Sequence, residues 1–134
     1  MKIFRVEIQV RGYELDGYGH VNHAVYLNYA EFARWRMVEE ASGGQDYFKR
    51  HGVAPVAVRA EVDYREPCYL ADWVVVETTL DQYRKRVAKF RHRVLKRDTG
   101  KLAAELLMTL LVVDAAGKAV SLPRDFQALF GEVP

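Results

Sequence analysis

One carboxylate, two glycines, two histidines and an asparagine stand within the eight residues from Asp16 to His23, immediately before a long apolar segment. Asn22 has the chemistry of a helix N-cap, because its side-chain oxygen can accept a hydrogen bond from a free backbone N–H group. The glycines permit a tight turn and a close approach of the backbone to a ligand. A helix that starts after Asn22 also presents unpaired N–H groups and the positive end of its dipole. This combination predicts an oxyanion-binding site.

Asp16 is the residue that could act on a carbonyl group held at such a site. A carboxylate beside a polarised carbonyl serves as a general base or a nucleophile, so the segment predicts acyl transfer or hydrolysis. Each residue taken alone also has a structural interpretation. An aspartate before a glycine is typical of turns, and His20 and His23 are typical of a loop and of a helix start. The residues alone leave both interpretations open.

Other catalytic chemistries find less support in the sequence. A metal site would need a third ligand, but His51 and His92 are isolated in different predicted elements. Ser42 and Ser121 are the only serines, and neither lies in a G-x-S-x-G elbow. Cys68, the only cysteine, has no nearby histidine that could activate it. We therefore expect no metal and no redox cofactor.

The composition fits one domain over residues 1–134. The formal net charge of +2, from 20 basic and 18 acidic residues, is too small to indicate nucleic acid or an anionic membrane as a partner. A single cysteine excludes an internal disulfide and suits a reducing compartment. The N-terminal segment alternates apolar and polar residues, and no run of about 18 apolar residues follows. We expect a soluble, cytoplasmic protein.

The elements that must position these residues are one long helix and several strands. The helix is predicted over roughly Asn22 to Ala41, is apolar on nearly every side, and should end at Gly43. Alternating apolar and polar residues predict the first strand over Phe4–Val10. Further strands are predicted over Val56–Tyr64, Trp73–Leu80, Ala88–Leu95 and Leu102–Val113, turns at Asp98–Gly100 and Asp114–Gly117, and a short closing helix over Pro123–Phe130.

This order of elements predicts an α+β protein in which a curved antiparallel sheet of five strands wraps around one long central helix. A parallel sheet is excluded because the crossover helices that it requires are missing. A single sheet covers the helix on one side only. The last strand also has Leu107, Leu111 and Val113 on its second face. We therefore expect a second subunit to cover the remaining apolar surface.

The segment from Asp16 to Arg34 resembles the D-x-x-G-x-V-x-x-x-x-Y-L signature of hot-dog-fold thioesterases of the 4-hydroxybenzoyl-CoA thioesterase type. Tyr64–Pro67 resembles the Y-x-x-P motif of that family at a strand end. The family fold is an antiparallel sheet around one long helix, as the elements already predict. Within the signature, His20–Asn22 resembles the long-chain acyl-CoA thioesterases, and His23–Tyr26 resembles the Tol-Pal-associated branch.

The resemblance implies an acyl-CoA thioesterase that acts as a homodimer or homotetramer with its sites at subunit interfaces. It places Asp16 at the position of the catalytic base or nucleophile, Gly19 in the catalytic loop, and the backbone N–H of His23 at the thioester carbonyl. The basic segment Arg84, Lys85 and Arg86 would meet the phosphates of coenzyme A. Without the resemblance, this segment is more typical of a solvated strand edge. The candidates for an acyl pocket are Tyr26, Tyr29, Phe32, Trp35 and Tyr64. We expect most of them to belong to the core and no more than two, Tyr26 and Tyr64, to contact the substrate.

Three alternatives belong to other functional classes or substrates. The fold also serves as a non-catalytic acyl-CoA-binding module, and an acyl carrier protein could replace coenzyme A as the thiol carrier. Nucleic-acid binding through the basic residues between 84 and 93 would show a steep salt dependence. The sequence leaves open the length of the acyl group, the role of the His20 and His23 side chains, and the choice between dimer and tetramer.

Overall fold

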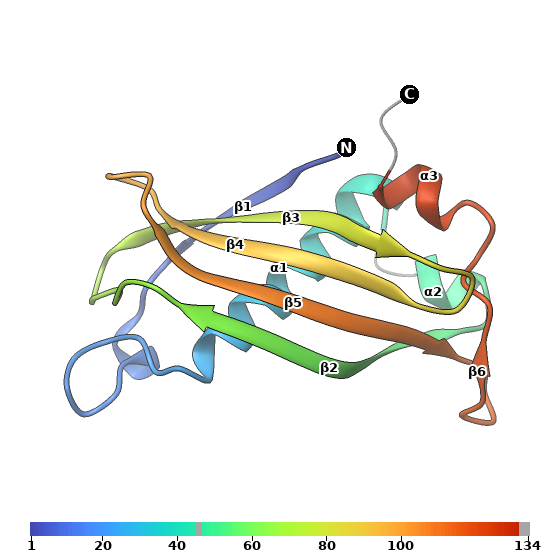
Figure 1. The fold of residues 1–134 in the computed structure, drawn as a ribbon, viewed down its shortest axis with the longest axis horizontal. Coiled ribbons are helices and arrows are strands. Elements are labelled where there is room, and N and C mark those ends of the chain that lie inside the picture. Colours follow the sequence, from blue (N-terminus) through green and yellow to red (C-terminus); the bar gives the residue numbers. More distant parts are fainter. Residues whose placement is uncertain (45–46, 132–134) are drawn as a thin grey trace.

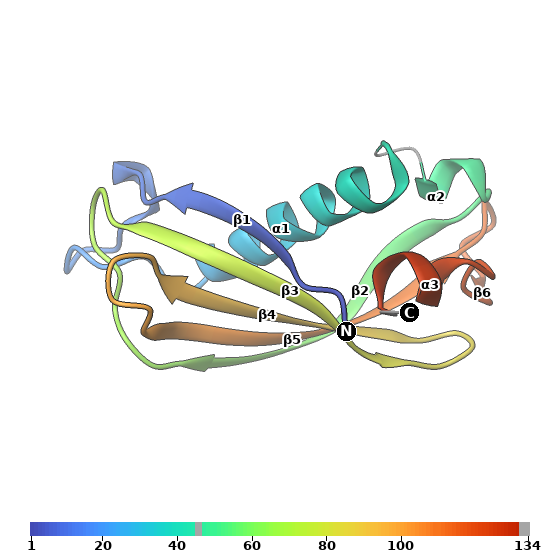
Figure 2. The same ribbon diagram turned by 90° about the horizontal axis from the view of Figure 1, so that it is seen from above.

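A computed structural model describes residues 1–44 and 47–131 and shows an antiparallel sheet with one long helix along one face (Figures 1 and 2). The strands are β1 (Phe4–Gln9), β2 (Ala54–Tyr64), β3 (Trp73–Tyr83), β4 (Ala88–Lys96), β5 (Leu102–Val113) and β6 (Ala119–Val120). The helices are the 3₁₀ turn η1 (Gly12–Glu14), α1 (Val25–Ser42), α2 (Tyr47–Arg50) and α3 (Phe126–Phe130). The sheet order is β1-β3-β4-β5-β2, and β6 pairs with the end of β5.

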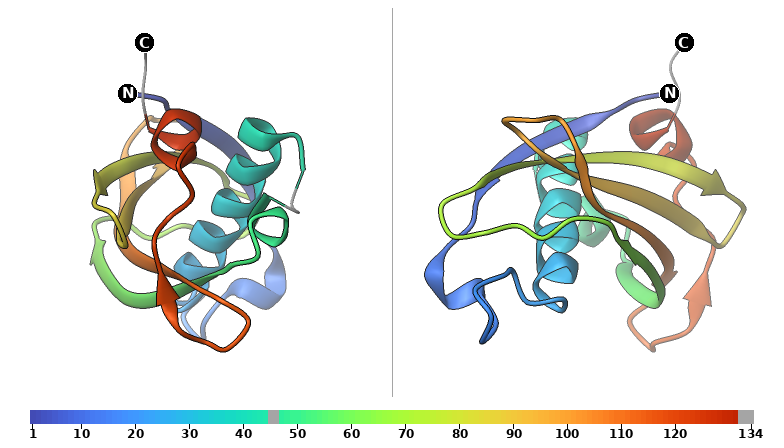
Figure 3. Two further views of the ribbon diagram at one scale, coloured as in Figure 1. Left: turned by 90° about the vertical axis from the view of Figure 1, so that its right-hand side faces the viewer. Right: turned by 60° about the vertical axis from the view of Figure 1, so that its left-hand side comes forward.

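The sheet is antiparallel because short turns join its central strands. Gly100, between β4 and β5, and Gly117, between β5 and β6, have φ angles of 75° and 80°, which glycine adopts without steric cost. Register shifts interrupt β2 after Ala57 and β3 after Leu80. Irregularities of this kind bend a strand, and Figure 3 shows the sheet curving around α1. The predicted fold class and both predicted turns are confirmed.

Helix α1 is buried on the side that faces the sheet and uncovered on the other. It begins three residues later than predicted and ends at Gly43, whose φ of 77° allows its N–H to donate to the Glu39 carbonyl. The buried residues of the helix are Tyr26, Tyr29, Ala30, Ala33, Met37 and Val38. Phe32 and Trp35 remain 46% and 36% exposed. One chain therefore covers this apolar helix incompletely, as its composition predicts.

Strand β2 forms one edge of the sheet and is exposed along most of its length. Val56 and Val58 are 40% and 52% exposed. The neighbouring strand β5 leaves Leu107 and Leu111 only half-buried on the outer face. This edge offers eleven residues of strand for pairing with another chain.

Three short elements are absent from the sequence prediction. Helix α2 has four residues, η1 has three and β6 has two, so none of them is long enough to show a periodicity. The addition of β6 gives the sheet six strands where five are predicted. No described helix offers the uninterrupted apolar length that crossing a membrane would take.

Candidate active site

The segment that carries Asp16 folds as a tight hairpin-like turn before α1. Leu15 and Val21 form an antiparallel bridge that closes it. The N–H of Asp16 donates to the carbonyl of His20 at 2.7 Å, and the N–H of Gly19 donates to the carbonyl of Asp16 at 3.2 Å. Gly19 has a φ of 83°, which disfavours any side chain at that position. The glycine therefore fixes the shape of the turn.

The carboxylate of Asp16 takes part in this turn through one of its two oxygens. Its Oδ1 accepts from the N–H groups of Tyr18 at 2.9 Å and His20 at 3.2 Å. These two hydrogen bonds lower the pKa of Asp16, so it is ionised at neutral pH. The second oxygen has no hydrogen-bond partner among the described residues. Asp16 is thus both a turn residue and a carboxylate with a free oxygen, and the two sequence interpretations are compatible.

The start of α1 leaves backbone N–H groups, among them that of His23, without an acceptor in the described part of the chain. The side chain of Asn22 accepts from the N–H of Ala24 at 2.9 Å, and its carbonyl accepts from the N–H of Val25 at 2.9 Å. The N-cap of α1 is Ala24, which no side chain caps, so the Asn22 oxygen accepts from the residue before the helix and is not the N-cap that the sequence predicts. The N–H of His23 is the donor that the resemblance assigns to the thioester carbonyl.

A pocket of about 280 Å³ joins the Asp16 turn, the start of α1 and the end of β2. Its lining residues are Asp16, His20, Val21, His23, Tyr26, Tyr64, Arg65, Glu66 and Pro67. The hydroxyl of Tyr64 donates to the carbonyl of His23 at 2.8 Å, and the Tyr64 and Tyr26 rings meet edge to face at 5.5 Å. These contacts fasten β2 to the helix start, so the pocket keeps its shape.

Tyr26 is the buried aromatic residue of this pocket, and its hydroxyl is hydrogen-bonded to Cys68, which does not line the pocket. Burial raises the pKa of the Tyr26 hydroxyl, which therefore stays a hydrogen-bond donor at neutral pH. Cys68 is fully buried, and burial raises the pKa of its thiol as well. A thiol that stays protonated and inaccessible is a poor nucleophile, in agreement with the interpretation of the sequence.

A second carboxylate, Glu14, lies two residues before Asp16. Unlike Asp16, it is buried and accepts hydrogen bonds on both of its oxygens. It is 5% exposed and accepts hydrogen bonds from the backbone N–H of Arg11 at 2.8 Å, the Arg11 guanidinium at 2.7 Å and the Tyr29 hydroxyl at 2.8 Å. Burial acts to raise the pKa of Glu14, but these hydrogen bonds outweigh it and the pKa is lowered. The carbonyl of Glu14 accepts from the N–H of Asn22 at 2.8 Å. Glu14 thus ties the Asp16 turn to Arg11, which follows β1, and to Tyr29 of α1.

Arg11 and Glu14 are local partners, three residues apart in a capping box around η1, but nothing in the sequence pattern marks the contact of Glu14 with Tyr29 of α1. The pocket residues Arg65, Glu66 and Pro67 do carry a signal, since they belong to the segment that resembles the Y-x-x-P motif. No group of three or more His, Cys, Asp or Glu side chains in residues 1–44 and 47–131 is placed to hold a metal ion.

The structure brings together Asp16, His23, Tyr26 and Tyr64 from the predicted site. Gly19 does not line the pocket, and Trp35 lines a different cavity farther along α1. Tyr29 and Phe32 line a groove beside β1.

The basic segment Arg84–Arg86 is an exposed turn between β3 and β4 at the opposite end of the sheet from the Asp16 turn (Figure 1). Within this turn the N–H of Arg84 donates to the carbonyl of Val87 at 2.8 Å, and the carbonyl of Lys85 accepts from the N–H of Leu122 at 2.9 Å. Inside one chain, the predicted phosphate-binding residues and the predicted catalytic residues therefore stay apart.

Comparison with known proteins identifies the family. The profile of the thioesterase-like superfamily matches residues 10–130. FadM of Escherichia coli, named a long-chain acyl-CoA thioesterase, is 33% identical over 82% of this chain and 83% of its own. The acyl-CoA thioester hydrolase YbgC of Escherichia coli O157:H7 is 26% identical over 96% of both chains. The crystal structure of YbaW from Escherichia coli superposes with a TM-score of 0.83 at 30% identity, over 93% of this chain and 94% of that one. The chain belongs to the thioesterase-like superfamily, which confirms the predicted resemblance.

Proposed function

We propose that the protein hydrolyses acyl-CoA thioesters in the pocket between the Asp16 turn and the start of α1. The observation that carries this proposal is the pairing, in one pocket, of an ionised carboxylate that has a free oxygen with a helix-start N–H that has no acceptor. The family of the chain and the names of its relatives support the same reaction. No cofactor is needed for it, because carboxylate and backbone dipoles suffice to activate water and to stabilise an oxyanion.

In the proposed reaction the thioester carbonyl oxygen accepts a hydrogen bond from the N–H of His23. Asp16 either takes a proton from the water that attacks the carbonyl carbon or attacks that carbon itself. The negative charge that develops on the carbonyl oxygen is stabilised by the same N–H group and by the helix dipole. With Asp16 as base, cleavage of the carbon–sulfur bond then releases the free acid and coenzyme A, whose thiolate takes up the proton. With Asp16 as nucleophile, the same cleavage releases coenzyme A and leaves a mixed anhydride on Asp16, which water hydrolyses to the free acid.

The same proposal includes pairing of two subunits through β2. A two-fold axis would run the two β2 strands antiparallel and place the start of one beside the end of the other. The exposed β3–β4 turn of the second subunit would then lie toward the Asp16 end of the first, which suits its predicted contact with the phosphates of coenzyme A. Dimer or dimer of dimers satisfies this geometry equally. A cytoplasmic location fits the single, reduced Cys68.

A panel of acyl-CoA thioesters, with release of free thiol as the readout, tests the proposal. Short, long and aromatic acyl groups belong in the panel, together with matched acyl carrier protein thioesters. We expect steady-state turnover with coenzyme A esters and weaker turnover with carrier-protein esters. Stoichiometric binding without thiol release would instead identify an acyl-CoA-binding module and exclude the enzyme.

A further inference from the structure

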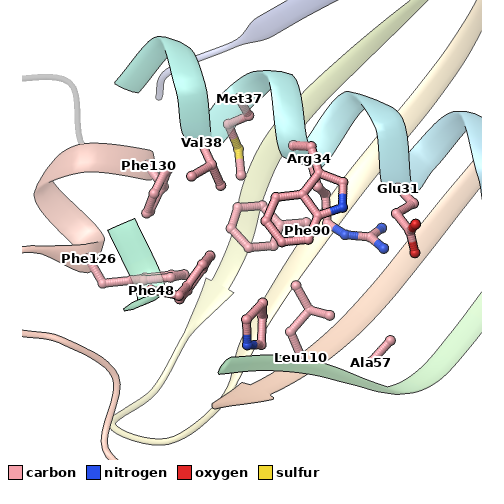
Figure 4. A pocket seen from close by; sticks show the side chains of 12 residues that line it. Glu31, Arg34, Met37, Val38, Phe48, Ala57, Phe90, Leu110, Phe126 and Phe130 are labelled. Carbon is pink, nitrogen blue, oxygen red and sulfur yellow. The ribbon is translucent and has the colours of Figure 1, made fainter. Parts of the chain in front are cut away.

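A second cavity, of about 100 Å³, lies between the middle of α1, helices α2 and α3, and the inner face of the sheet (Figure 4). Most of its wall is apolar and aromatic, with Trp35, Phe48, Phe90, Leu110, Phe126 and Phe130 among the lining residues. Two charged side chains, Glu31 and Arg34, line it as well. A charged group against so apolar a wall requires a partner. The partners of Arg34 therefore decide whether its charge is satisfied within the chain or available to a ligand.

Arg34 is held by a neutral histidine. Its Nη1 lies 3.1 Å from Nε2 of His92, and Nδ1 of His92 lies 2.8 Å from Oγ1 of Thr78. His92 and Thr78 are fully buried, and burial, followed by the charge of Arg34, lowers the pKa of His92 to about 3. Since a guanidinium can only donate, Nε2 of His92 accepts and Nδ1–H donates to Thr78. His92 therefore orients Arg34 without neutralising its charge.

The positive charge of Arg34 lacks a counter-charge in contact with it. Arg34 forms no ion pair with a carboxylate of the described residues, and a guanidinium has five N–H donors. Burial lowers the pKa of Arg34, and the charge of Glu31, which acts in the opposite direction, does not offset this effect. Glu31 is also exposed to solvent, which weakens its field inside the cavity. The cavity thus has an apolar body and a cationic wall with free donors.

This cavity and the Asp16 pocket are built on the same two elements. Helix α1 contributes Tyr26 to the pocket and Arg34 to the cavity, about 12 Å apart along the helix at 1.5 Å per residue. Strand β2 contributes Tyr64 to the pocket and Ala57 to the cavity. A chain-like ligand that follows α1 and β2 from the pocket therefore reaches Arg34.

The wall between the two hollows is also apolar. Ala60 and Val62 lie on β2 between Tyr64 and Ala57, and their partners on β5 are the buried Met108 and Leu106. These two residues of β2 consequently share the inner face of the sheet with the core, and because Ala60 is exposed and Val62 half-buried they continue an accessible apolar surface between the two hollows. The route suits an aliphatic chain.

We propose that the cavity receives the far end of the acyl group and that Arg34 binds a carboxylate there. The preferred substrates are then thioesters of dicarboxylic acids, with one carboxyl group in the thioester and the other free. Methylene groups match the apolar wall, and a carboxylate matches the guanidinium by paired, charge-assisted hydrogen bonds. The inference rests on the proposed thioesterase function and specifies its substrate class.

The kinetic test compares acyl groups that differ only at the far end. Adipoyl-, suberoyl- and sebacoyl-CoA are assayed against hexanoyl-, octanoyl- and decanoyl-CoA and against the corresponding terminally hydroxylated esters. For the wild type we expect the highest kcat/KM with a carboxylate terminus. In Arg34→Met the ratio of kcat/KM for the carboxylate ester to that for the methyl ester should fall at least about tenfold, the effect of losing hydrogen bonds to a charged group. Arg36→Met, an exposed arginine on the same helix, is the matched control and should keep the wild-type ratio.

A binding measurement keeps the inference testable if Arg34→Met does not fold. Suberic and sebacic acids, titrated into the wild type, should change the fluorescence of Trp35 in the cavity wall, whereas octanoic and decanoic acids should bind more weakly. Trp35→Phe identifies the source of the signal. The inference is overturned if both types of acid bind equally well, or if the wild type prefers the hydroxylated esters to the carboxylate esters. It is also overturned if Arg34→Met keeps the wild-type ratio of kcat/KM for carboxylate and methyl esters. Absence of all thioester hydrolysis together with tight binding of the diacids would instead contradict the proposed function.

Discussion

Two turns of this protein have the same sequence pattern and the same geometry. The turns Asp16–Gly19 and Asp114–Gly117 both have the sequence D-x-x-G. In each, Oδ1 of the aspartate accepts hydrogen bonds from the backbone N–H groups two and four residues later. In both, the glycine N–H donates to the aspartate carbonyl, and φ of the glycine is 83° or 80°. Both are closed by pairing of the residue before the aspartate with the residue five positions after it.

The two turns differ in what lies beside them. The Asp16 turn leads into the start of α1 and lines a pocket with residues of β2. The Asp114 turn leads into the two-residue strand β6 at the opposite end of the sheet (Figure 1). The D-x-x-G pattern is therefore a turn motif, and a free helix-start N–H with a pocket in front of it is what makes one of its two copies a candidate for catalysis.

The largest expected effect separates the two aspartates directly. Asp16→Asn should lower kcat by about a hundredfold or more, because the amide is neither a base nor a nucleophile. Asp114→Asn is the matched control, with the same turn geometry, and should keep kcat near the wild-type value. Thiol release by the purified variants, with circular dichroism to confirm the fold, provides the measurement. Equal kcat in the two variants would show that Asp16 is a turn residue without a catalytic role.

The second effect concerns the anchor that the Asp16 turn has in Glu14. Glu14→Gln removes a buried charge that accepts three hydrogen bonds, so we expect a loss of about 2 kcal/mol in unfolding free energy and of roughly tenfold in kcat. Glu7→Gln, an exposed glutamate on β1, should change neither. Urea unfolding and steady-state kinetics report the two quantities. A stability loss with full kcat would show that Glu14 supports the fold without positioning Asp16.

The pH dependence of stability provides a further test of this anchor. The pKa of folded Glu14 is lowered from its usual value of 4.5, so its stabilising contribution is present above that pH and is lost as pH falls through the folded pKa. The difference in unfolding free energy between wild type and Glu14→Gln should therefore be largest near pH 7 and shrink below about pH 4. Urea midpoints at pH 7, 4 and 3 measure it. A difference that stays constant over this range would contradict the ionised state assigned to Glu14.

The smallest expected effect comes from the β3–β4 turn, at the far end of the sheet like the Asp114 turn. Replacement of Arg84, Lys85 and Arg86 by Ala should raise KM for an acyl-CoA by about fivefold and change kcat less, because contacts with remote phosphates mainly contribute binding. A short acyl-pantetheine thioester lacks those phosphates and serves as control. Its kcat/KM should be similar in wild type and variant. Equal losses with both substrates would favour the interpretation of this segment as a strand edge.

The long elements are predictable from the sequence because burial on one face produces a periodicity. The five long strands, the long helix, its end at Gly43 and two glycine turns all follow from patterns within single segments. The start of α1 is misplaced because the loop residues Asn22 to Ala24 are also compatible with a helix. Which side of α1 remains uncovered depends on the order of the strands in the sheet. This order places β2 at the edge, and it cannot be read from the pattern of one segment.

The site residues divide in the same way. Asp16 and His23 are found from sequence because the turn and the helix start are local, and Tyr64 is found through its motif; their roles in catalysis and binding stay predictions. The cavity at Arg34 has no local signal, since His92 is 58 residues away along the chain and becomes its partner only in the folded sheet.

The sequence by itself determined that both aspartate turns would form, because a D-x-x-G turn needs only the hydrogen bonds of its own few residues and a glycine with positive φ. It also determined the strands and the helix, whose periodicities reflect one buried face each. Only the tertiary structure decided which turn would face a helix start, that Glu14 would be buried against Tyr29, and that Arg34 would be half-buried without a carboxylate of the described residues in contact with it. Those properties depend on burial and on partners from distant segments, and these exist only once the sheet has closed around α1.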